Sequence, residues 1–218
     1  MKEPDMNQIA QLRRDYRSGG LVEKDLRDHP LDQFGLWFDQ ALRSGILEPN
    51  AMTLATADQS GRPSARMVLL KGYDKEGFSF FSNYTSRKGR ELAENPRASL
   101  VFFWGELERQ VRIEGETEKL SQTISEEYFH SRPFESQIGA WASSQGSVLK
   151  GRDELEKAHE IIASRFKGKQ VPMPGYWGGY LLRPSRIEFW QGRPSRLHDR
   201  LVYRKAEEDQ WVTERLAP

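Results

Sequence analysis

The chain has 218 residues, enough for one large domain or two small ones with a substantial core. Its 33 lysines and arginines nearly balance its 32 aspartates and glutamates, and the formal net charge of +1 argues against a general nucleic-acid binder. The absence of cysteine excludes disulfides, thiolate metal sites and cysteine nucleophiles, and no segment approaches the roughly 20 apolar residues of a membrane span.

The first 20 residues are polar and charged and contain no apolar run of the signal-peptide type. We therefore expect a mobile segment over residues 1–20, followed by a single domain over residues 21–218. Together with the lack of cysteine, this composition suits the reducing cytoplasm. The first clear element is an amphipathic helix over residues 30–45, where apolar residues recur at helical spacing until Gly45.

After this helix the hydrophobic period changes from that of a helix to that of a strand. Strand-like segments cover residues 51–57, 64–73, 78–83, 97–104 and 108–120, interrupted by a helix over 86–95 that Pro96 closes. Two more helical patterns lie near residues 121–143 and 151–167, and strands return at 178–192, 196–205 and 210–216. Many closely spaced strands with inserted helices predict an α+β fold, mainly β, built as a small antiparallel barrel with surrounding helices.

The helix over residues 86–95 carries Arg87, Lys88 and Arg90 in its first turns. A helix N-terminus has a partial positive charge, so acids and not bases are expected there. A phosphate bound at the helix start would explain the basic residues. A solvated basic turn is the alternative.

Two further polar groups could serve a ligand. Arg66 and Lys71 differ in parity along their strand, so they can face one ligand only if Lys71 lies beyond the strand end or a bulge intervenes. Otherwise they are two unrelated surface charges.

Tyr128, Arg132 and Ser136 follow one another at intervals of four residues, and Pro133 predicts that two helices meet at this point. Two hydroxyls and a guanidinium converging there would suit a phosphate, and an ordinary helix corner is the alternative.

Near the C-terminus we predict two strands around the turn formed by residues 192–195. This arrangement would place Arg196, His198 and Arg200 on one strand face, where a bound ligand would explain the close positive charges. The chain has no GxGxxG after a strand and no Walker loop, HExxH or GxSxG motif, and its four histidines lack metal-ligand spacing. We therefore expect no metal site.

Eight segments resemble the pyridoxine 5′-phosphate oxidase family and occur in the family's order from about Leu12 to Pro218. They read "LRRDYRSGGL", "RMVLLKGYD", "FFSNYTSRKGRELAENPRASLVFFW", "ERQVRIEG", "YFHSRPFESQIGAWAS", "YWGGY", "IEFWQGRPSRLHDR" and "ERLAP". The resemblance implies a split-barrel homodimer with two FMN sites at the subunit interface. It also implies oxidation of pyridoxine or pyridoxamine 5′-phosphate by O2 to pyridoxal 5′-phosphate and H2O2, with release of ammonia from the amine.

The resemblance also implies roles for individual residues. FMN contacts would be made by Arg66, Met67, Val68, Leu69, Lys71, Phe81, Ser82, Arg87, Lys88, Gln110, Gln145, Gly146, Trp190 and Arg200. The clamp on the substrate phosphate would comprise Lys71, Tyr128, Arg132 and Ser136. Arg196 and His198 would be the catalytic residues over the pyridine ring, and a mobile segment with Arg13, Arg14 and Tyr16 would close over the substrate.

The chain departs from the family pattern at three positions. Gly146 stands where a serine is common, Asp15 where a glutamate is usual, and Glu48 where an aspartate is expected.

Two other functions fit parts of the sequence. A flavin-binding split-barrel reductase or sensor would share the barrel and the flavin contacts, but it would need neither the phosphate clamp nor the Arg196/His198 pair. A non-enzymatic binder of phosphorylated partners or nucleic acid would use the basic clusters alone, and the near-zero net charge argues against it. We expect neither a nucleic-acid partner nor a membrane partner.

Overall fold

A computed structural model of the chain describes residues 11–12, 15–17, 19–207 and 210–218. Arg13 and Arg14, two of the predicted substrate contacts, lie outside the described residues. The chain forms two compact units that alternate along the sequence. Unit 1 contains the described residues up to Pro49 together with Phe103–Arg112 and Ile187–Pro218, and unit 2 contains Asn50–Phe102 and Ile113–Arg186.

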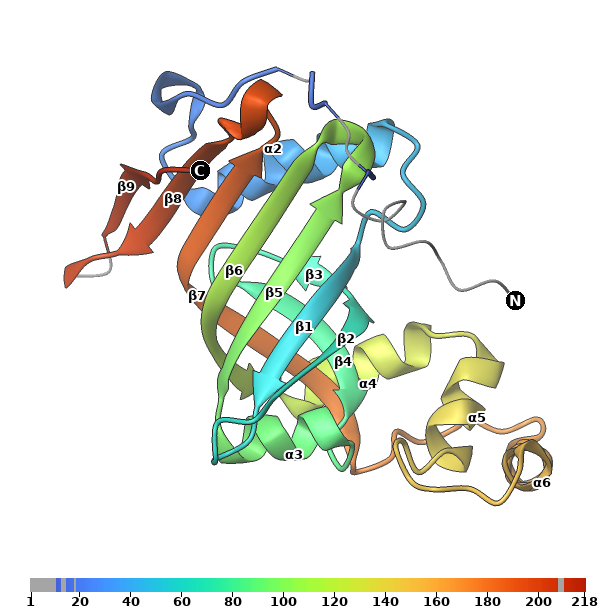
Figure 1. The fold of residues 1–218 in the computed structure, drawn as a ribbon. Helices are drawn as coiled ribbons and strands as arrows, with labels where there is room; N and C mark the ends of the chain where they lie inside the picture. The colour runs from blue at the N-terminus through green and yellow to red at the C-terminus, as the bar shows by residue number, and fades with distance from the viewer. Residues whose placement is uncertain (1–10, 13–14, 18, 208–209) are drawn as a thin grey trace. The chain divides into compact units, whose positions relative to one another are not determined.

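The described residues form nine strands (Figure 1). These are β1 (Ala51–Ala57), β2 (Pro63–Leu69), β3 (Gly72–Tyr73), β4 (Phe78–Asn83), β5 (Arg97–Trp104), β6 (Arg109–Lys119), β7 (Trp177–Gln191), β8 (Asp199–Lys205) and β9 (Trp211–Arg215). Neighbouring strands follow the order β2-β1-β5-β6-β7-β4-β3, and β8 pairs with β7 and β9. The pairs β1–β2, β1–β5, β3–β4, β4–β7 and β8–β9 are antiparallel.

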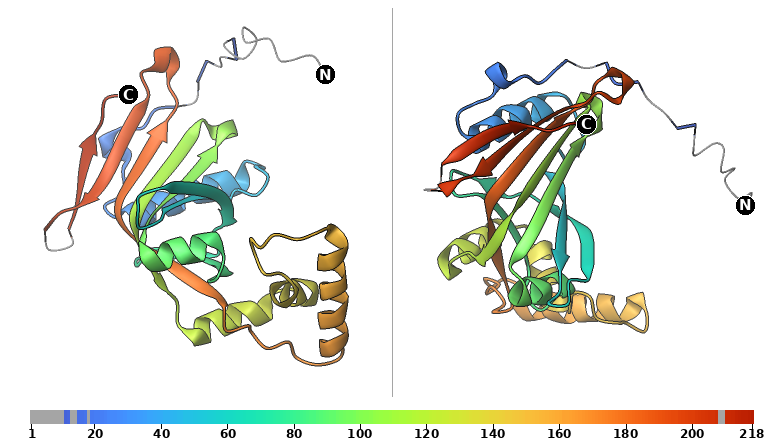
Figure 2. Two further views of the ribbon diagram at one scale, coloured as in Figure 1. Left: turned by 60° about the horizontal axis from the view of Figure 1, so that its bottom comes forward. Right: turned by 60° about the vertical axis from the view of Figure 1, so that its left-hand side comes forward.

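Helices interrupt the strands at the predicted places (Figure 2). The α-helices are α2 (Pro30–Arg43), α3 (Arg87–Glu94), α4 (Gln122–Ser131), α5 (Phe134–Ala142) and α6 (Arg152–Phe166). Short 3-10 turns are η1 (Glu23–Asp25), η2 (Gly105–Leu107) and η3 (Pro194–Arg196). The predicted α+β fold with an antiparallel, mainly β architecture is confirmed.

Unit 1 is held together by aromatic packing on one face of α2. Phe34 and Trp37 are buried at helical spacing, with the Phe34 ring 6.2 Å from Trp104 and the Trp37 ring 5.2 Å from Phe189. Phe189 in turn packs edge-on against Tyr203 of β8. The amphipathic pattern of residues 30–45 therefore correctly predicts which side of α2 faces the core of unit 1.

In unit 2, β1 alternates buried and half-buried residues, as expected for a strand with one face in a core. Its register with β2 places Leu54 opposite Arg66 and Thr56 opposite Ser64. Helix α4 ends at Ser131, Arg132 has extended backbone angles, and Pro133 caps the start of α5. The predicted meeting of two helices at Pro133 is confirmed. The first helix ends there because proline disfavours helical geometry in the preceding residue.

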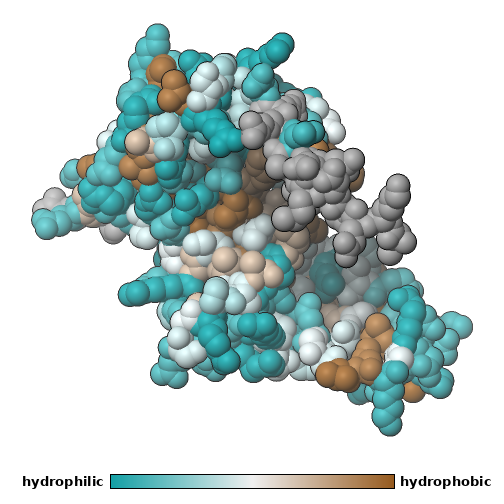
Figure 3. Space-filling model, in the orientation of Figure 1, coloured by the Kyte–Doolittle hydropathy of each residue, from teal (hydrophilic) through white to brown (hydrophobic). Residues whose placement is uncertain are grey.

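Helices α5 and α6 pack beside one another in unit 2 around a small cluster that includes Phe129, Ile138 and Phe166. Exposed apolar side chains remain in this helical region, seen in brown at the lower right of Figure 3. Phe134, Val148 and Ile161 are among the exposed apolar residues of the chain. No helix in the described part of the chain combines the length and the apolar character needed to cross a membrane.

Gly89 provides a test of how closely α3 packs against the backbone of residues 83–84. A Cβ at this position would overlap the carbonyl oxygen of Tyr84 and lie 2.8 Å from that of Asn83. Gly89→Ala should destabilise the protein by about 1–3 kcal/mol, even though alanine favours helices.

The matched control is Gly139→Ala in α5, where a Cβ would meet nothing within 4 Å. That variant should be up to about 1 kcal/mol more stable than the wild type. Urea unfolding of the three proteins measures both differences, and equal effects of the two substitutions would contradict the close approach at Gly89.

Candidate functional site

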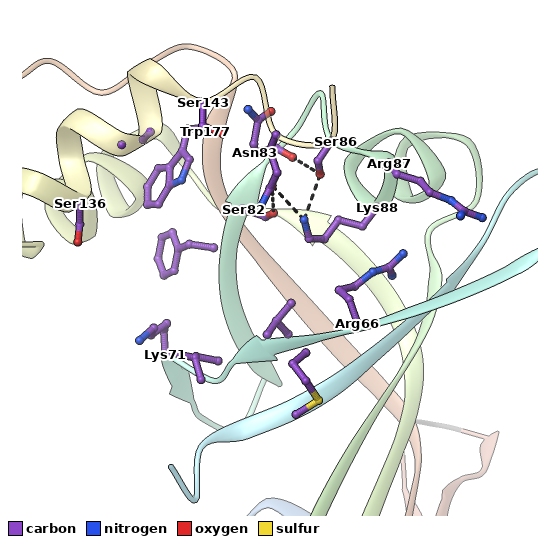
Figure 4. A pocket seen from close by; sticks show the side chains of 18 of the residues that line it. Arg66, Lys71, Ser82, Asn83, Ser86, Arg87, Lys88, Ser136, Ser143 and Trp177 are labelled. Carbon is purple, nitrogen blue, oxygen red and sulfur yellow. Dashed lines mark hydrogen bonds between the residues drawn. The ribbon is translucent and has the colours of Figure 1, made fainter. Parts of the chain in front are cut away.

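Unit 2 contains a cavity of about 1060 Å³ between β2, β4 and the helices (Figure 4). This volume lies at the upper end of the range typical of small-molecule pockets. The lining residues are Ser64, Ala65, Arg66, Met67, Val68, Leu69, Lys71, Phe81, Ser82, Asn83, Ser86, Arg87, Lys88, Tyr128, Arg132, Pro133, Ser136, Gly139, Ala140, Ser143, Gln145, Gly146 and Trp177. Predicted residues from four separate sequence segments therefore share one cavity.

The charge of the lining is strongly one-sided. It contains five cationic side chains, Arg66, Lys71, Arg87, Lys88 and Arg132, and no aspartate or glutamate among the described residues. The whole chain has a net charge of only +1, so this concentration is local. Like charges repel at short range, and such a cavity is suited to an anionic ligand.

Lys88 is the most enclosed of these cations, with 9% of its surface exposed. Its Nζ donates to Ser86 Oγ at 3.2 Å and to Gln145 Oε1 at 3.0 Å, and both partners are neutral. Burial lowers the pKa of Lys88, and the nearby charge of Arg66 lowers it further. An anion placed beside Lys88 would therefore lower the energetic cost of keeping this charge buried.

The start of α3 is organised around Ser86. The Ser86 side chain caps the helix by accepting from Gly89 N, and it also accepts from Lys88. Of the predicted basic helix start, Arg87 and Lys88 line the cavity, whereas Arg90 does not and donates to Thr85 O. Figure 4 shows Arg66, Arg87 and Lys88 on one side, with Lys71 and Ser136 on the other.

Arg132 lies over the ring of Trp177, with its guanidinium carbon 4.8 Å from the ring centroid. Burial lowers the pKa of Arg132, and Nη1 is a buried donor that finds no hydrogen-bond partner among the described residues. A buried unpaired donor is costly, which makes a ligand at this point favourable. The Tyr128 ring stacks on Phe81 at a centroid separation of 3.9 Å and lies nearly parallel to Trp177.

The parity difference between Arg66 and Lys71 is resolved by the end of β2. The strand ends at Leu69, and Lys71 lies beyond it, where its backbone N–H donates to Ser79 O. Both residues line the cavity. The condition under which they could serve one ligand is therefore met.

A second group of predicted residues lies in unit 1. Tyr16, Arg196 and His198 line a separate small cavity with Leu12, Asp15, Arg193 and Ser195. The rings of Tyr16, Trp190 and His198 contact one another, with centroids 4.7 to 5.5 Å apart. The backbone N–H of Arg193 donates to His198 Nδ1 at 3.1 Å, so a neutral His198 carries its proton on Nε2.

The prediction that Arg196, His198 and Arg200 share one strand face is wrong. Strand β8 begins only at Asp199, and the chain before it turns through η3, with φ of 57° at Ser195 and 62° at Arg196. These left-handed residues break the period-two pattern on which the prediction depended.

Arg200 itself is on β8, away from that cavity's lining. Its Nε and Nη2 donate to the two carboxylate oxygens of buried Glu188 at 2.8 and 3.2 Å. Gln110 lies half-buried on β6, and neither Gln110 nor Trp190 is among the described residues that line the larger cavity. The predicted FMN contacts are thus divided between the two units, with Gln110, Trp190 and Arg200 in unit 1.

Some residues of the larger cavity were not identified from the sequence. Asn83, Ser143 and Trp177 line it, and Glu91 lies behind it with only 4% of its surface exposed. The one sequence signal for Glu91 is its position four residues after Arg87 on a helix, a spacing that favours an ion pair.

Comparisons with known proteins were made for the whole chain. A family model described as pyridoxamine 5′-phosphate oxidase matches residues 38–165. A second, described as the pyridoxine 5′-phosphate oxidase C-terminal dimerisation region, matches residues 177–218. Pyridoxine/pyridoxamine 5′-phosphate oxidase from Polynucleobacter asymbioticus is 57% identical over 98% of this chain and 100% of its own. The protein of the same name from Rubrobacter xylanophilus is 53% identical over the full length of both.

Solved structures give the same picture of the fold. PhzG from Burkholderia lata 383, in complex with tetrahydrophenazine-1-carboxylic acid, superposes with a TM-score of 0.86. It is 32% identical and covers 92% of this chain and 99% of its own. A pyridoxamine 5′-phosphate oxidase-related, FMN-binding protein from Nostoc punctiforme has a TM-score of 0.70 at 16% identity, over 88% of this chain and 100% of its own. The latter likeness concerns the fold alone.

The buried charge of Lys88 leads to a testable expectation. Inorganic phosphate should raise the midpoint of thermal unfolding of the wild type, by about 2–4 °C for each kcal/mol of binding. Lys88→Met should lose most of this shift. Without phosphate it should be at least as stable as the wild type, because a buried charge with neutral partners is removed.

Lys169→Met, at an exposed position, is the matched control and should keep the full shift. A phosphate shift that survives unchanged in Lys88→Met would contradict anion binding at the start of α3.

Proposed function

The chain belongs to the pyridoxamine 5′-phosphate oxidase family, and from this we propose that it is an FMN-dependent oxidase of pyridoxine 5′-phosphate and pyridoxamine 5′-phosphate. The observation that carries the proposal is the cavity of unit 2, with five cations, no carboxylate among its described lining residues and an unpartnered Arg132 Nη1. FMN and the vitamin phosphate each bring a phosphate group. Two such ligands would account for positive groups on both sides of one cavity.

The residues present fit FMN at the α3 side of the cavity. Arg66, Arg87 and Lys88, with the hydroxyl of Ser82, would hold its phosphate. Main-chain groups of residues 66–69 and the side chain of Gln145 would contact the remainder. When bound, FMN supplies the two-electron redox chemistry that no side chain provides.

The opposite side of the cavity suits the substrate phosphate. Arg132 offers a guanidinium with a buried free donor, and Lys71, Tyr128 and Ser136 complete a set of cationic and hydroxyl groups around it. Charge-assisted hydrogen bonds from these groups would fix the substrate by the end that does not react. Binding energy spent there orients the carbon to be oxidised.

We assign Arg196 and His198 to the pyridine ring of the substrate. Because Nδ1 of His198 accepts from Arg193 N, the neutral side chain would present Nε2–H to the substrate as a donor. His198 would then position the substrate and would not remove a proton from it through Nδ1. Tyr16, in ring contact with His198, would border the same space.

A homodimer would bring the two groups of residues to one FMN. The chain matches a dimerisation region over residues 177–218, which contains Trp190, Arg196, His198 and Arg200. Met67, which lines the cavity, is 63% exposed in the single chain, and a second copy could cover it. We therefore propose that FMN lies at the subunit interface, with Gln110, Trp190 and Arg200 among its contacts.

The reaction follows from these assignments. Either substrate plus O2 would give pyridoxal 5′-phosphate and H2O2, and the amine substrate would also consume water and release ammonia. An anaerobic titration of the FMN-loaded protein with pyridoxine 5′-phosphate tests the proposal directly. The flavin absorbance should bleach, and on admission of air it should return as pyridoxal 5′-phosphate appears.

Flavin that binds but never bleaches would overturn the oxidase assignment in favour of a flavin-binding reductase or sensor of the same fold. Failure to bind flavin would overturn the cofactor assignments as well.

Replacement of Arg196 separates substrate positioning from FMN binding. Arg196→Leu should lower turnover on the order of a hundredfold and weaken substrate binding, while FMN affinity stays at the wild-type value. Leucine keeps a Cβ at this left-handed position, so backbone strain is matched.

Arg204→Leu, which removes an exposed arginine from β8, is the control and should behave as the wild type. Steady-state kinetics and flavin titration of both variants give the comparison. Wild-type turnover in Arg196→Leu would show that Arg196 does not act on the substrate.

A further inference from the structure

A buried carboxylate stands directly behind the cationic side of the cavity. Glu91 lies on α3, one turn after Arg87, and its side chain does not reach the cavity surface. Burial alone would raise the pKa of Glu91, but hydrogen bonds from four side chains outweigh burial and lower the pKa to about 2. The group is therefore ionised at neutral pH.

The two carboxylate oxygens of Glu91 serve different arginines. Oε1 accepts from Arg87 Nε at 2.7 Å, within the same helix. Oε2 accepts from Arg66 Nη2 at 3.2 Å, across to β2. One buried carboxylate thus links two cations that come from different elements and line the same cavity.

Two hydroxyls complete this link. Thr56 and Ser64 face one another across β1 and β2, and each donates to Glu91 Oε2, at 2.5 and 2.6 Å. Each also accepts from the guanidinium of Arg66. Arg66 donates in addition to Leu54 O at 3.2 Å. The Arg66 head group is therefore fixed at its two terminal nitrogens.

Arg87 is held differently. Its side chain is 64% exposed, and its bond to Glu91 uses Nε alone. Both terminal nitrogens of the Arg87 guanidinium lie outside this ion pair. Glu91 therefore orients a long, exposed side chain that would otherwise sample many rotamers.

We propose that Glu91 is a positioning residue for phosphate binding. It holds the Arg87 guanidinium where the two terminal nitrogens can donate to the phosphate of FMN. It also fixes Arg66, whose terminal N–H groups are used within the protein, as a positive charge beside that phosphate. The proposal rests on the proposed function, which places that phosphate beside α3. Glu91 offsets the mutual repulsion of the cations before the ligand arrives, and the arginines need no reordering when it binds.

The opposite effect is also physically possible, since a carboxylate near a phosphate repels it. The two effects have opposite signs in one measurement. If positioning dominates, removing the charge of Glu91 weakens FMN binding. If repulsion dominates, removing that charge strengthens FMN binding.

The test compares FMN with riboflavin, which lacks the phosphate, by fluorescence titration of the apoprotein. Glu91→Gln keeps the size of the side chain, but its NH2 group would face one of the arginines as donor against donor. We expect the FMN dissociation constant to rise roughly tenfold or more, while that of riboflavin stays within about twofold. Glu94→Gln removes the same charge from the exposed end of α3 and should change neither constant.

A second variant tests the same contact in case Glu91→Gln does not fold. Arg87→Lys alters an exposed side chain and keeps the positive charge, but it loses the Nε that contacts Glu91. It should lower the preference for FMN over riboflavin severalfold in the wild-type background. Its effect in Glu91→Gln should be smaller than in the wild type, since both changes break the contact between Arg87 and Glu91.

Three outcomes would overturn the proposal: tighter FMN binding by Glu91→Gln, an equal loss of affinity for both flavins, or full preference for FMN in Arg87→Lys. An equal loss would indicate a structural role only. If the wild type itself does not prefer FMN to riboflavin, the phosphate site of the proposed function fails, and this proposal fails with it.

Discussion

The repulsion among five cations that line one cavity is the constraint on which unit 2 depends. Groups close to the cations offset part of this repulsion. Glu91 accepts hydrogen bonds from Arg66 and Arg87, while Lys88 donates to the neutral groups of Ser86 and Gln145. The cavity thus keeps an excess of positive charge in the absence of a ligand, and an anion completes the balance. In the proposed function, a phosphorylated ligand would supply that negative charge and stabilise this unit.

Rigid surroundings make this arrangement specific. The register of β1 on β2 brings Thr56 and Ser64 to the same carboxylate, and a shift of β2 by one residue would send the Ser64 hydroxyl to the other face. The absence of a side chain at Gly89 lets α3 approach the carbonyl of Tyr84 closely. Both features fix the elements that carry the arginines and Lys88, and a rigid support of this kind is what the proposed phosphate site would need.

The proposed substrate-positioning residues and the proposed phosphate clamps lie in different units of the chain. The cationic cavity is in unit 2, whereas Arg196, His198 and Trp190 belong to unit 1, where rings of Tyr16, Trp190 and His198 pack together. The match to a C-terminal dimerisation region suggests how residues of both units could serve one ligand, because a second copy of the chain can supply one of the two groups. In the proposed homodimer, unit 1 residues would act on a substrate that unit 2 residues hold by its phosphate.

The sequence alone determined the elements, because local periodicity and turn residues set them: the bounds of β1, β4 and β5 and the helix break at Pro133 agree with the patterns. It also indicated the basic helix start, since bases are unexpected where the helix dipole is positive. Tertiary structure alone decided that Arg66 and Lys71 line one cavity. It also decided that Arg200 pairs with Glu188 and does not share a strand face with Arg196. It alone revealed Glu91, whose partners Thr56, Ser64 and Arg66 are 25 to 35 residues away in the sequence. The strand prediction failed at Ser195 and Arg196 because left-handed backbone angles do not show in the spacing of apolar and polar residues. Contacts between segments far apart in the chain do not show in that spacing either.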